Sequence, residues 1–282
     1  MRISVTHSTL YRYNHPVYLE PHTFRLRPRQ DGTQWLHRYA LEISPAPAGQ
    51  TECLDQDGNA ALQVWFTELV PELTVRSSFE VETLRENPFD YVLTVPAALP
   101  LSYAGPLHAA LAPYLGTSDI PQAVREFAEG IGQEAGGQVL AFLARLNGHL
   151  FEDFGHAVRA EGPPHAPEFT LREREGTCRD LAMLFCAACH TVGIAARFVS
   201  GYEREAATQE RAYMHAWVEA YLPGGGWRGY DPTQGLAVAQ SHVVVAAAAD
   251  PRLAAPATGT FRGSATARME FAIELTVSGE GR

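Results

Sequence analysis

The chain has 282 residues, of which 46% are hydrophobic and 19% charged, so it carries enough apolar material for a globular core. Its formal net charge of -10 excludes the basic surface that nucleic-acid phosphates require, and no basic run is long enough to hold an anionic membrane. We therefore expect neither a nucleic-acid nor a membrane partner.

The first thirty residues, the apolar stretches and the cysteines indicate the cellular compartment of the protein. The first thirty residues contain no apolar run typical of a signal peptide, and no stretch reaches the roughly 18 apolar residues that a membrane span needs. The four cysteines, Cys53, Cys178, Cys186 and Cys189, are too few and too unevenly spaced for a disulfide framework. We therefore expect a cytoplasmic protein with free thiols, and nothing in the sequence indicates its oligomeric state.

Residues 1–95 are predicted to form a β-rich domain. Short runs of Val, Ile, Tyr, Phe and Thr are separated by Pro and Gly, and Asp57-Gly58-Asn59 has the composition of a hairpin tip. The spacing of these runs favours a small antiparallel sandwich or barrel. The histidines of this region show no catalytic spacing, so we assign them structural or surface roles.

Residues 96–282 are predicted to form a second, α+β domain. A proline-rich stretch from Asn87 to Ser102 separates the two domains, and helical patterns then continue to about Phe154. The next segment, residues 155–176, is polar and contains several prolines, which is typical of a surface loop. Because it leads directly to Cys178, we expect it to line a cleft.

The stretch TCRDLAMLFCAACHTVG predicts a helix that begins at a cysteine. Thr177 is a good N-cap, Asp180 completes an acidic variant of the capping box, and Gly193 follows the last helical residue. Cys178 is then the first helical residue, where free backbone N–H groups and the helix dipole stabilise a thiolate. The same N–H groups can hold an oxyanion. An inert buried cysteine is the alternative, and the helix start alone does not decide between them.

Cys186 and Cys189 form a CxxC inside the same predicted helix. A redox pair lies at a helix start rather than two turns into it. A zinc site needs four ligands, and of the other candidate residues only His190 is close in sequence. We therefore assign both cysteines to core packing and expect no metal.

The segment AYMHAWVEAYLPGGGWRGYDP predicts a β-hairpin with its turn in the Pro-Gly-Gly-Gly run. If the hairpin closes symmetrically about Pro223, His215 lies directly opposite Asp231, within reach of an imidazole–carboxylate hydrogen bond. An even-numbered loop would break this pairing. Together with Cys178, these residues make the cysteine version of a nucleophile, a base and a group that orients the base.

Residues 176–235 carry motifs in a distinctive order. The cysteine block is followed by a Gly-Tyr strand, by His-Ala-Trp-Val-Glu and by Asp-Pro-Thr. In these motifs the chain resembles the bacterial transglutaminase-like superfamily, and the β-rich first 95 residues resemble the N-terminal region of many bacterial members. The resemblance implies a papain-like core, in which the helix bearing the nucleophile packs on an antiparallel sheet. It also implies Cys178 as nucleophile, His215 as general base and acid, and Asp231 as the orienting residue.

The resemblance implies a reaction class and leaves the acceptor open. Active members attack an amide carbonyl and form a thioester, which water or an amine then resolves. We expect a cysteine peptidase or amidase that hydrolyses a peptide or protein substrate without a cofactor. The alternatives are a protein-glutamine transglutaminase, an acyltransferase, and a non-catalytic peptide-binding module. The backbone N–H of Cys178 is expected to form half of the oxyanion hole, with a second donor near residues 151–156.

Overall fold

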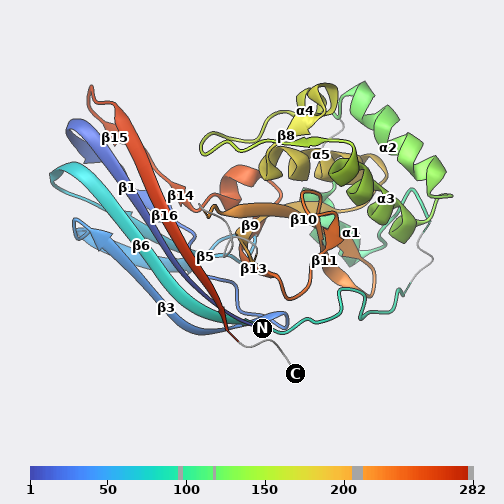
Figure 1. Ribbon diagram of the computed structural model, residues 1–282, viewed down its shortest axis with the longest axis horizontal. Coiled ribbons are helices and arrows are strands. Elements are labelled where there is room, and N and C mark those ends of the chain that lie inside the picture. The colour runs from blue at the N-terminus through green and yellow to red at the C-terminus, as the bar shows by residue number, and fades with distance from the viewer. Residues whose placement is uncertain (95–97, 117–118, 205–211, 279–282) are drawn as a thin grey trace.

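The computed structural model describes residues 1–94, 98–116, 119–204 and 212–278. A long, curved sheet stands beside a core of helices and shorter strands (Figure 1). The predicted α+β class and the predicted strand-rich N-terminal region are both confirmed. Within the described residues, no helix combines the length and the apolar character needed to cross a membrane.

Two antiparallel sheets form the N-terminal region. Their strands are β1 (Arg2–Leu19), β2 (His22–Phe24), β3 (Gln34–Ser44), β4 (Gly49–Leu54), β5 (Ala60–Trp65), β6 (Leu69–Thr83), β14 (Ala257–Thr258), β15 (Phe261–Arg262) and β16 (Ala267–Ser278). The larger sheet has the order β15-β1-β6-β3 with β16 also paired to β1, and the smaller has the order β14-β2-β5-β4. The predicted hairpin tip lies between β4 and β5, where Gly58 adopts a φ of 78°.

The last three strands return to the N-terminal sheets. β16 pairs with β1 along most of its length, from Arg2 opposite Ser278 to Tyr13 opposite Ala267. β14 and β15 pair with β2 and β1. The division at residue 95 stays a prediction, but the strands at the end of the second segment complete the sheets of the first.

The core contains five α-helices among the described residues. They are α1 (Pro106–Leu111), α2 (Gln122–Glu134), α3 (Val139–Glu152), α4 (Pro167–Glu173) and α5 (Cys178–Thr191). The segment before Cys178 is therefore not only a loop. It contains α4, which Pro167 begins, and the short parallel pair β7 (Gly155–His156) and β8 (Glu175–Gly176).

A five-stranded antiparallel sheet supports α5, the helix that begins at Cys178, as predicted. Its order is β12-β11-β10-β9-β13, with β9 (Ala196–Glu203), β10 (His215–Leu222), β11 (Gly226–Asp231), β12 (Leu236–Ala237) and β13 (His242–Ala248). Ala216, Val218 and Ala220 of β10 share one buried cluster with Leu181 and Phe185 of α5. This packing fixes the start of α5 next to the start of β10.

The β10–β11 hairpin closes two residues away from the predicted register. Leu222 lies opposite Gly226, so the turn centres on Gly224, one residue later than predicted. Gly224 has a φ of 88°, and a Cβ there would meet a backbone oxygen at 2.2 Å, so this position requires glycine. His215 is therefore not directly opposite Asp231, and that prediction is wrong. The loop is still odd-numbered, so both side chains keep the same face.

Candidate active site

The helix α5 begins at Cys178, as the sequence predicts. Thr177 is the N-cap, and its backbone N–H donates to Oδ2 of Asp180 at 2.8 Å. At the other end, Gly193 has a φ of 77° and its N–H donates to the carbonyl of His190 at 3.1 Å. Local capping therefore places Cys178 among the free N–H groups of the first turn.

The buried carboxylate of Asp180 ties this helix start to the preceding segment. It accepts two hydrogen bonds from the guanidinium of Arg159, at 2.9 and 3.0 Å, and one from the N–H of His165 at 2.7 Å. Burial would raise the pKa of Asp180, but these bonds and those from Thr177 hold it well below its usual value. Residues 156–160 and 162–164 are held beside Cys178 in this way, and they line a cavity there, which confirms the predicted cleft.

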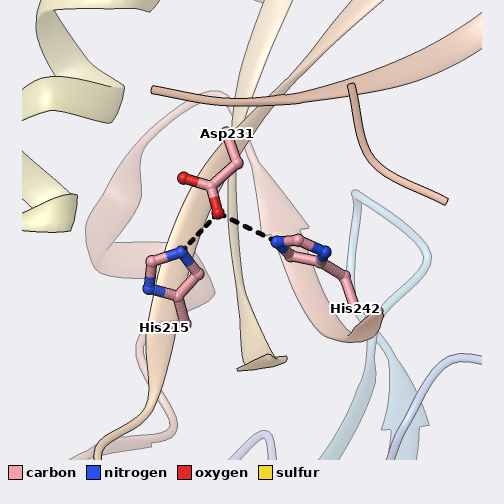
Figure 2. A group of neighbouring side chains, drawn as sticks. All are labelled: His215, Asp231 and His242. Carbon is pink, nitrogen blue, oxygen red and sulfur yellow. Dashed lines mark hydrogen bonds and ion pairs between the residues drawn. The ribbon is translucent and has the colours of Figure 1, made fainter. Parts of the chain in front are cut away.

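His215, at the start of β10, and Asp231, at the end of β11, lie side by side. Nε2 of His215 donates to Oδ2 of Asp231 at 2.7 Å (Figure 2). This bond leaves Nδ1 as the ring nitrogen that can meet the thiol of Cys178, with which His215 also forms a side-chain hydrogen bond. The structure therefore brings together the three residues that the sequence singled out.

The pKa values of the thiol and the imidazole move in opposite directions. Burial would raise the pKa of Cys178, but the hydrogen bond and charge of His215, the charge of Arg179 and the N–H of Ala216 together lower it. Burial would lower the pKa of His215, but Asp231 and then Cys178 hold it well above its usual value. Both shifts favour a thiolate–imidazolium pair.

Asp231 has a second imidazole partner, His242, to which the sequence analysis assigned no role. Nε2 of His242 donates to the same Oδ2 at 2.9 Å (Figure 2), and Nδ1 of His242 accepts from the hydroxyl of Ser241 at 2.8 Å. Thr233 holds the other oxygen, Oδ1, through its N–H at 2.9 Å and its hydroxyl at 2.5 Å. Burial would raise the pKa of Asp231, but the two histidines hold it well below its usual value.

Trp217 supports both imidazoles from inside the core. Its ring stacks on His215 with the centroids 6.1 Å apart, and it meets His242 edge-on at 4.9 Å. Trp217 is fully buried in a small cluster that includes Val199 and Val244. The tryptophan is therefore a packing element behind the site and limits the rotation of the two rings.

His215, Asp231 and His242 are also a candidate metal-binding group. One potential ligand atom from each residue lies within 4.8 Å of the other two. In this structure, however, Nε2 of each histidine donates to the same carboxylate oxygen of Asp231. The three potential ligand atoms are therefore already hydrogen-bonded to one another. The geometry is that of a hydrogen-bonded chain that orients His215, and the absence of a metal stays a prediction.

Cys178 and His215 line a cavity of about 650 Å³. The core supplies one wall, through residues 156–160, residues 162–164 and the start of α5. The inner face of the large N-terminal sheet supplies the opposite wall, through β1, β6 and β16. A ligand held between the two parts of the molecule would therefore contact the thiol.

Comparison with known proteins identifies the family. The bacterial transglutaminase-like N-terminal region matches residues 3–82, and the transglutaminase-like superfamily matches residues 125–232. An uncharacterised protein of Mycobacterium tuberculosis is 30% identical over 259 residues, which cover 86% of this chain and 82% of the relative. The chain belongs to the bacterial transglutaminase-like superfamily. All three candidate catalytic residues lie within the matched transglutaminase-like region, whereas His242 lies beyond it.

Two further similar proteins cover the chain to different extents. A protein-glutamine gamma-glutamyltransferase of Pseudomonas aeruginosa is 32% identical over 108 residues, which are 35% of this chain and 16% of that protein. A crystal structure of a candidate cysteine protease from Cytophaga hutchinsonii superposes with a TM-score of 0.73 at 21% identity, over 100% of this chain and 92% of that one. The second likeness supports the whole fold, including the curved N-terminal sheet.

Proposed function

We propose that this protein is a thiol-dependent hydrolase of peptide or amide bonds. Cys178 attacks the carbonyl, His215 takes the thiol proton and later gives it to the leaving amine, and Asp231 keeps the imidazole oriented. Water activated by His215 then cleaves the thioester and frees Cys178. The observation that carries this proposal is a cysteine at a helix start that lines the same cavity as an imidazole, which is itself bonded to a buried carboxylate.

The start of α5 also offers a place for the oxyanion. As the first residue of the helix, Cys178 has a backbone N–H without a partner from a preceding turn. In the segment proposed for the second donor, the N–H of Gly155 is bonded to the carbonyl of Arg174. His156 is the residue of that segment that lines the cavity, so we propose the second donor there.

Alkylation by iodoacetamide tests the proposal directly. The rate at each cysteine would be mapped by peptide mass spectrometry between pH 5 and pH 9, in the native protein and in His215→Ala. We expect Cys178 to react faster at pH 6 than the exposed Cys53, because the lowered pKa of Cys178 leaves more of its thiol ionised. His215→Ala should lose this advantage. A native Cys178 that reacts no faster than Cys53 would favour the peptide-binding module instead.

A transglutaminase is the second candidate, because a Pseudomonas relative bears that name. We favour hydrolysis because water is always present, whereas transfer needs a site that admits an amine and excludes water. A glutamine-containing peptide incubated with a primary amine would separate the two activities. Hydrolysis gives glutamate at the glutamine position, and transfer gives the amine adduct, which mass spectrometry distinguishes.

We also propose a cytoplasmic location. All four cysteines are free, and one of them, Cys53, is exposed. An exposed free thiol persists most readily in a reducing compartment. Fractionation of cells that produce the protein would test this, and recovery in the periplasmic or extracellular fraction would contradict it.

A further inference from the structure

The inner face of the large N-terminal sheet is packed at both ends and open in the middle. The residues buried in apolar clusters at the two ends include Ile3, Val5 and Leu275 at one end and Val17, Leu19 and Leu73 at the other. Between these ends, partly exposed residues of the same face line the cavity: Thr9, Tyr11, Met269, Phe271 and Ile273. The interface between sheet and core therefore has a gap beside Cys178.

The middle strand of this wall, β1, presents a small residue to the cavity. Thr9 on β1 lies opposite Phe271 on β16 and opposite Val75 on β6, and Figure 1 shows β1 and β16 running side by side. Directly opposite side chains on neighbouring strands contact one another, and Thr9 and Val75 are both short, so a hollow lies beside the larger Phe271. A larger side chain at this position would fill part of the cavity.

The sheet side of the cavity offers apolar surface without a charge at neutral pH. Its titratable imidazole, His7, is bonded to the hydroxyls of Tyr202 at 2.8 Å and Thr9 at 3.2 Å, and burial lowers its pKa to about 4. The arginines among the lining residues belong to the core side. Two of them are paired, Arg159 with Asp180 and Arg252 with Asp250.

The sheet side of the cavity is also the side better suited to the acyl group. During turnover the acyl group stays bonded to sulfur, whereas the amine must leave and water must enter. The apolar sheet side can hold the acyl group in place, and the polar core side beside His215 is left for the exchange of amine for water.

We propose that this cavity binds the acyl part of a short peptide or N-acylated amino acid that has an apolar side chain next to the attacked carbonyl. The proposal rests on the proposed function of Cys178. The thiolate forms the C–S bond as the C–N bond breaks, and the amine leaves with the proton from His215. A volume of about 650 Å³ is within the range of small-ligand pockets, which favours such a substrate over a folded protein chain.

Amino-acyl chloromethyl ketones test this proposal without any need for turnover. Reagents built on N-acetylated phenylalanine, alanine, aspartate and lysine would be compared by their rate of alkylation at Cys178. We expect the phenylalanine reagent to react at least about tenfold faster than the alanine, aspartate and lysine reagents, since one buried apolar side chain commonly gives a factor of this size. Thr9→Phe should remove this preference, measured within the variant as the ratio of the phenylalanine rate to the alanine rate.

Two further variants serve as a matched control and as a second probe of the cavity. Ser8→Phe adds the same phenyl group on the opposite face of the same strand, so it should behave like the native protein. Phe271→Ala enlarges the hollow and should move the preference towards a tryptophan reagent, which provides a result even if Thr9→Phe does not fold.

The outcomes separate this inference from the proposed function. Equal rates for all four reagents, with Cys178 still reactive towards iodoacetamide, would overturn the inference alone. Loss of the preference in Ser8→Phe as well as Thr9→Phe would also overturn it. A native Cys178 that iodoacetamide does not label preferentially would instead overturn the proposed function.

Discussion

The two walls of the cavity are built by different means. On the core wall, hydrogen bonds fix the groups around the buried carboxylate: Asp231 accepts from His215, His242 and both donors of Thr233. On the sheet wall, neighbouring strands hold mostly apolar side chains such as Phe271, and shape defines the surface. Proton transfer depends on orientation within a fraction of an ångström, whereas apolar recognition depends on volume. The two walls are therefore suited to chemistry and to selection, respectively.

Among the substitutions considered, Asp231→Asn on the core wall should have the largest effect, which is on the rate of hydrolysis. Asparagine lacks the charge that holds the pKa of His215 up, so that pKa falls and the pKa of Cys178 rises. A thiolate–imidazolium pair gains activity as the pH rises through the thiol pKa and loses activity as the pH rises through the imidazole pKa. A higher thiol pKa and a lower imidazole pKa therefore narrow the active pH range from both sides. We expect hydrolysis to fall by about 10³-fold, measured as a pH–rate profile.

An exposed aspartate–histidine pair provides the matched control for this change. Asp153 on the surface accepts from Nδ1 of His149 at 2.9 Å, a distance similar to that in the buried pair. Asp153→Asn should leave the rate and the pH profile unchanged, because it removes the same charge away from Cys178. A similar loss in both variants would contradict the role assigned to Asp231.

Much of the core wall could be predicted because its signals are local. Capping acts within one turn, so Thr177, Asp180 and Gly193 define the helix that begins with Cys178. Strand alternation has a period of two, so an odd-numbered loop puts His215 on the same face as its partner even though the register was wrong. The exact register depended on which glycine of the turn takes a positive φ, which composition alone does not decide.

The sheet wall could not be predicted because it depends on pairing between the two ends of the chain. β16 has an alternating pattern, but this pattern does not specify β1 as its neighbour. The position of His242 was missed for a related reason, since β13 pairs with β9 rather than with the strand that precedes it. The sequence predicts the cleft beside Cys178, but the sheet wall of the cavity follows from the pairing of β1 with β16 and was accessible only in three dimensions.

The second largest effect should appear on the sheet wall, at His7. The pKa of His7 in the folded protein is about 4, below the usual 6.5. As the pH falls, His7 is therefore protonated in the unfolded chain before it is protonated in the folded protein. The stability contribution is complete above about pH 6.5 and is lost as the pH falls towards 4. We expect this residue to account for a loss of about 2 kcal/mol in the free energy of unfolding between pH 7 and pH 5.

Urea unfolding at the two pH values would measure this contribution. His7→Gln keeps an amide that can bond to the hydroxyl of Tyr202 but does not titrate, so it should lose less stability at pH 5 than the native chain. His22 and His190 also have lowered pKa values. Their contribution to the pH dependence of stability is the same in the native protein and in His7→Gln, so it cancels in the comparison. His15→Gln, at an exposed position on the same strand, should keep the native pH dependence; a native-like loss in His7→Gln would disprove the assignment.

The smallest effect should come from His242→Phe, which tests the outer part of the hydrogen-bonded chain. Phenylalanine keeps a ring beside Trp217 but removes one donor to Asp231, which retains His215 and Thr233 as partners. The lost hydrogen bond is worth about 1 kcal/mol, so we expect a rate reduction of roughly fivefold and a small shift of the acid limb to higher pH.

A purely structural role for His242 predicts a different pattern from an orienting role. Loss of packing would lower stability and spare the pH profile, and His242→Gln would not restore activity. If the imidazole acts by holding Asp231, the glutamine amide can still donate to the same oxygen, so His242→Gln should recover most of the lost rate and the native acid limb. The comparison of these two variants decides whether orientation of the carboxylate, rather than burial beside Trp217, is what the second histidine contributes to the core wall.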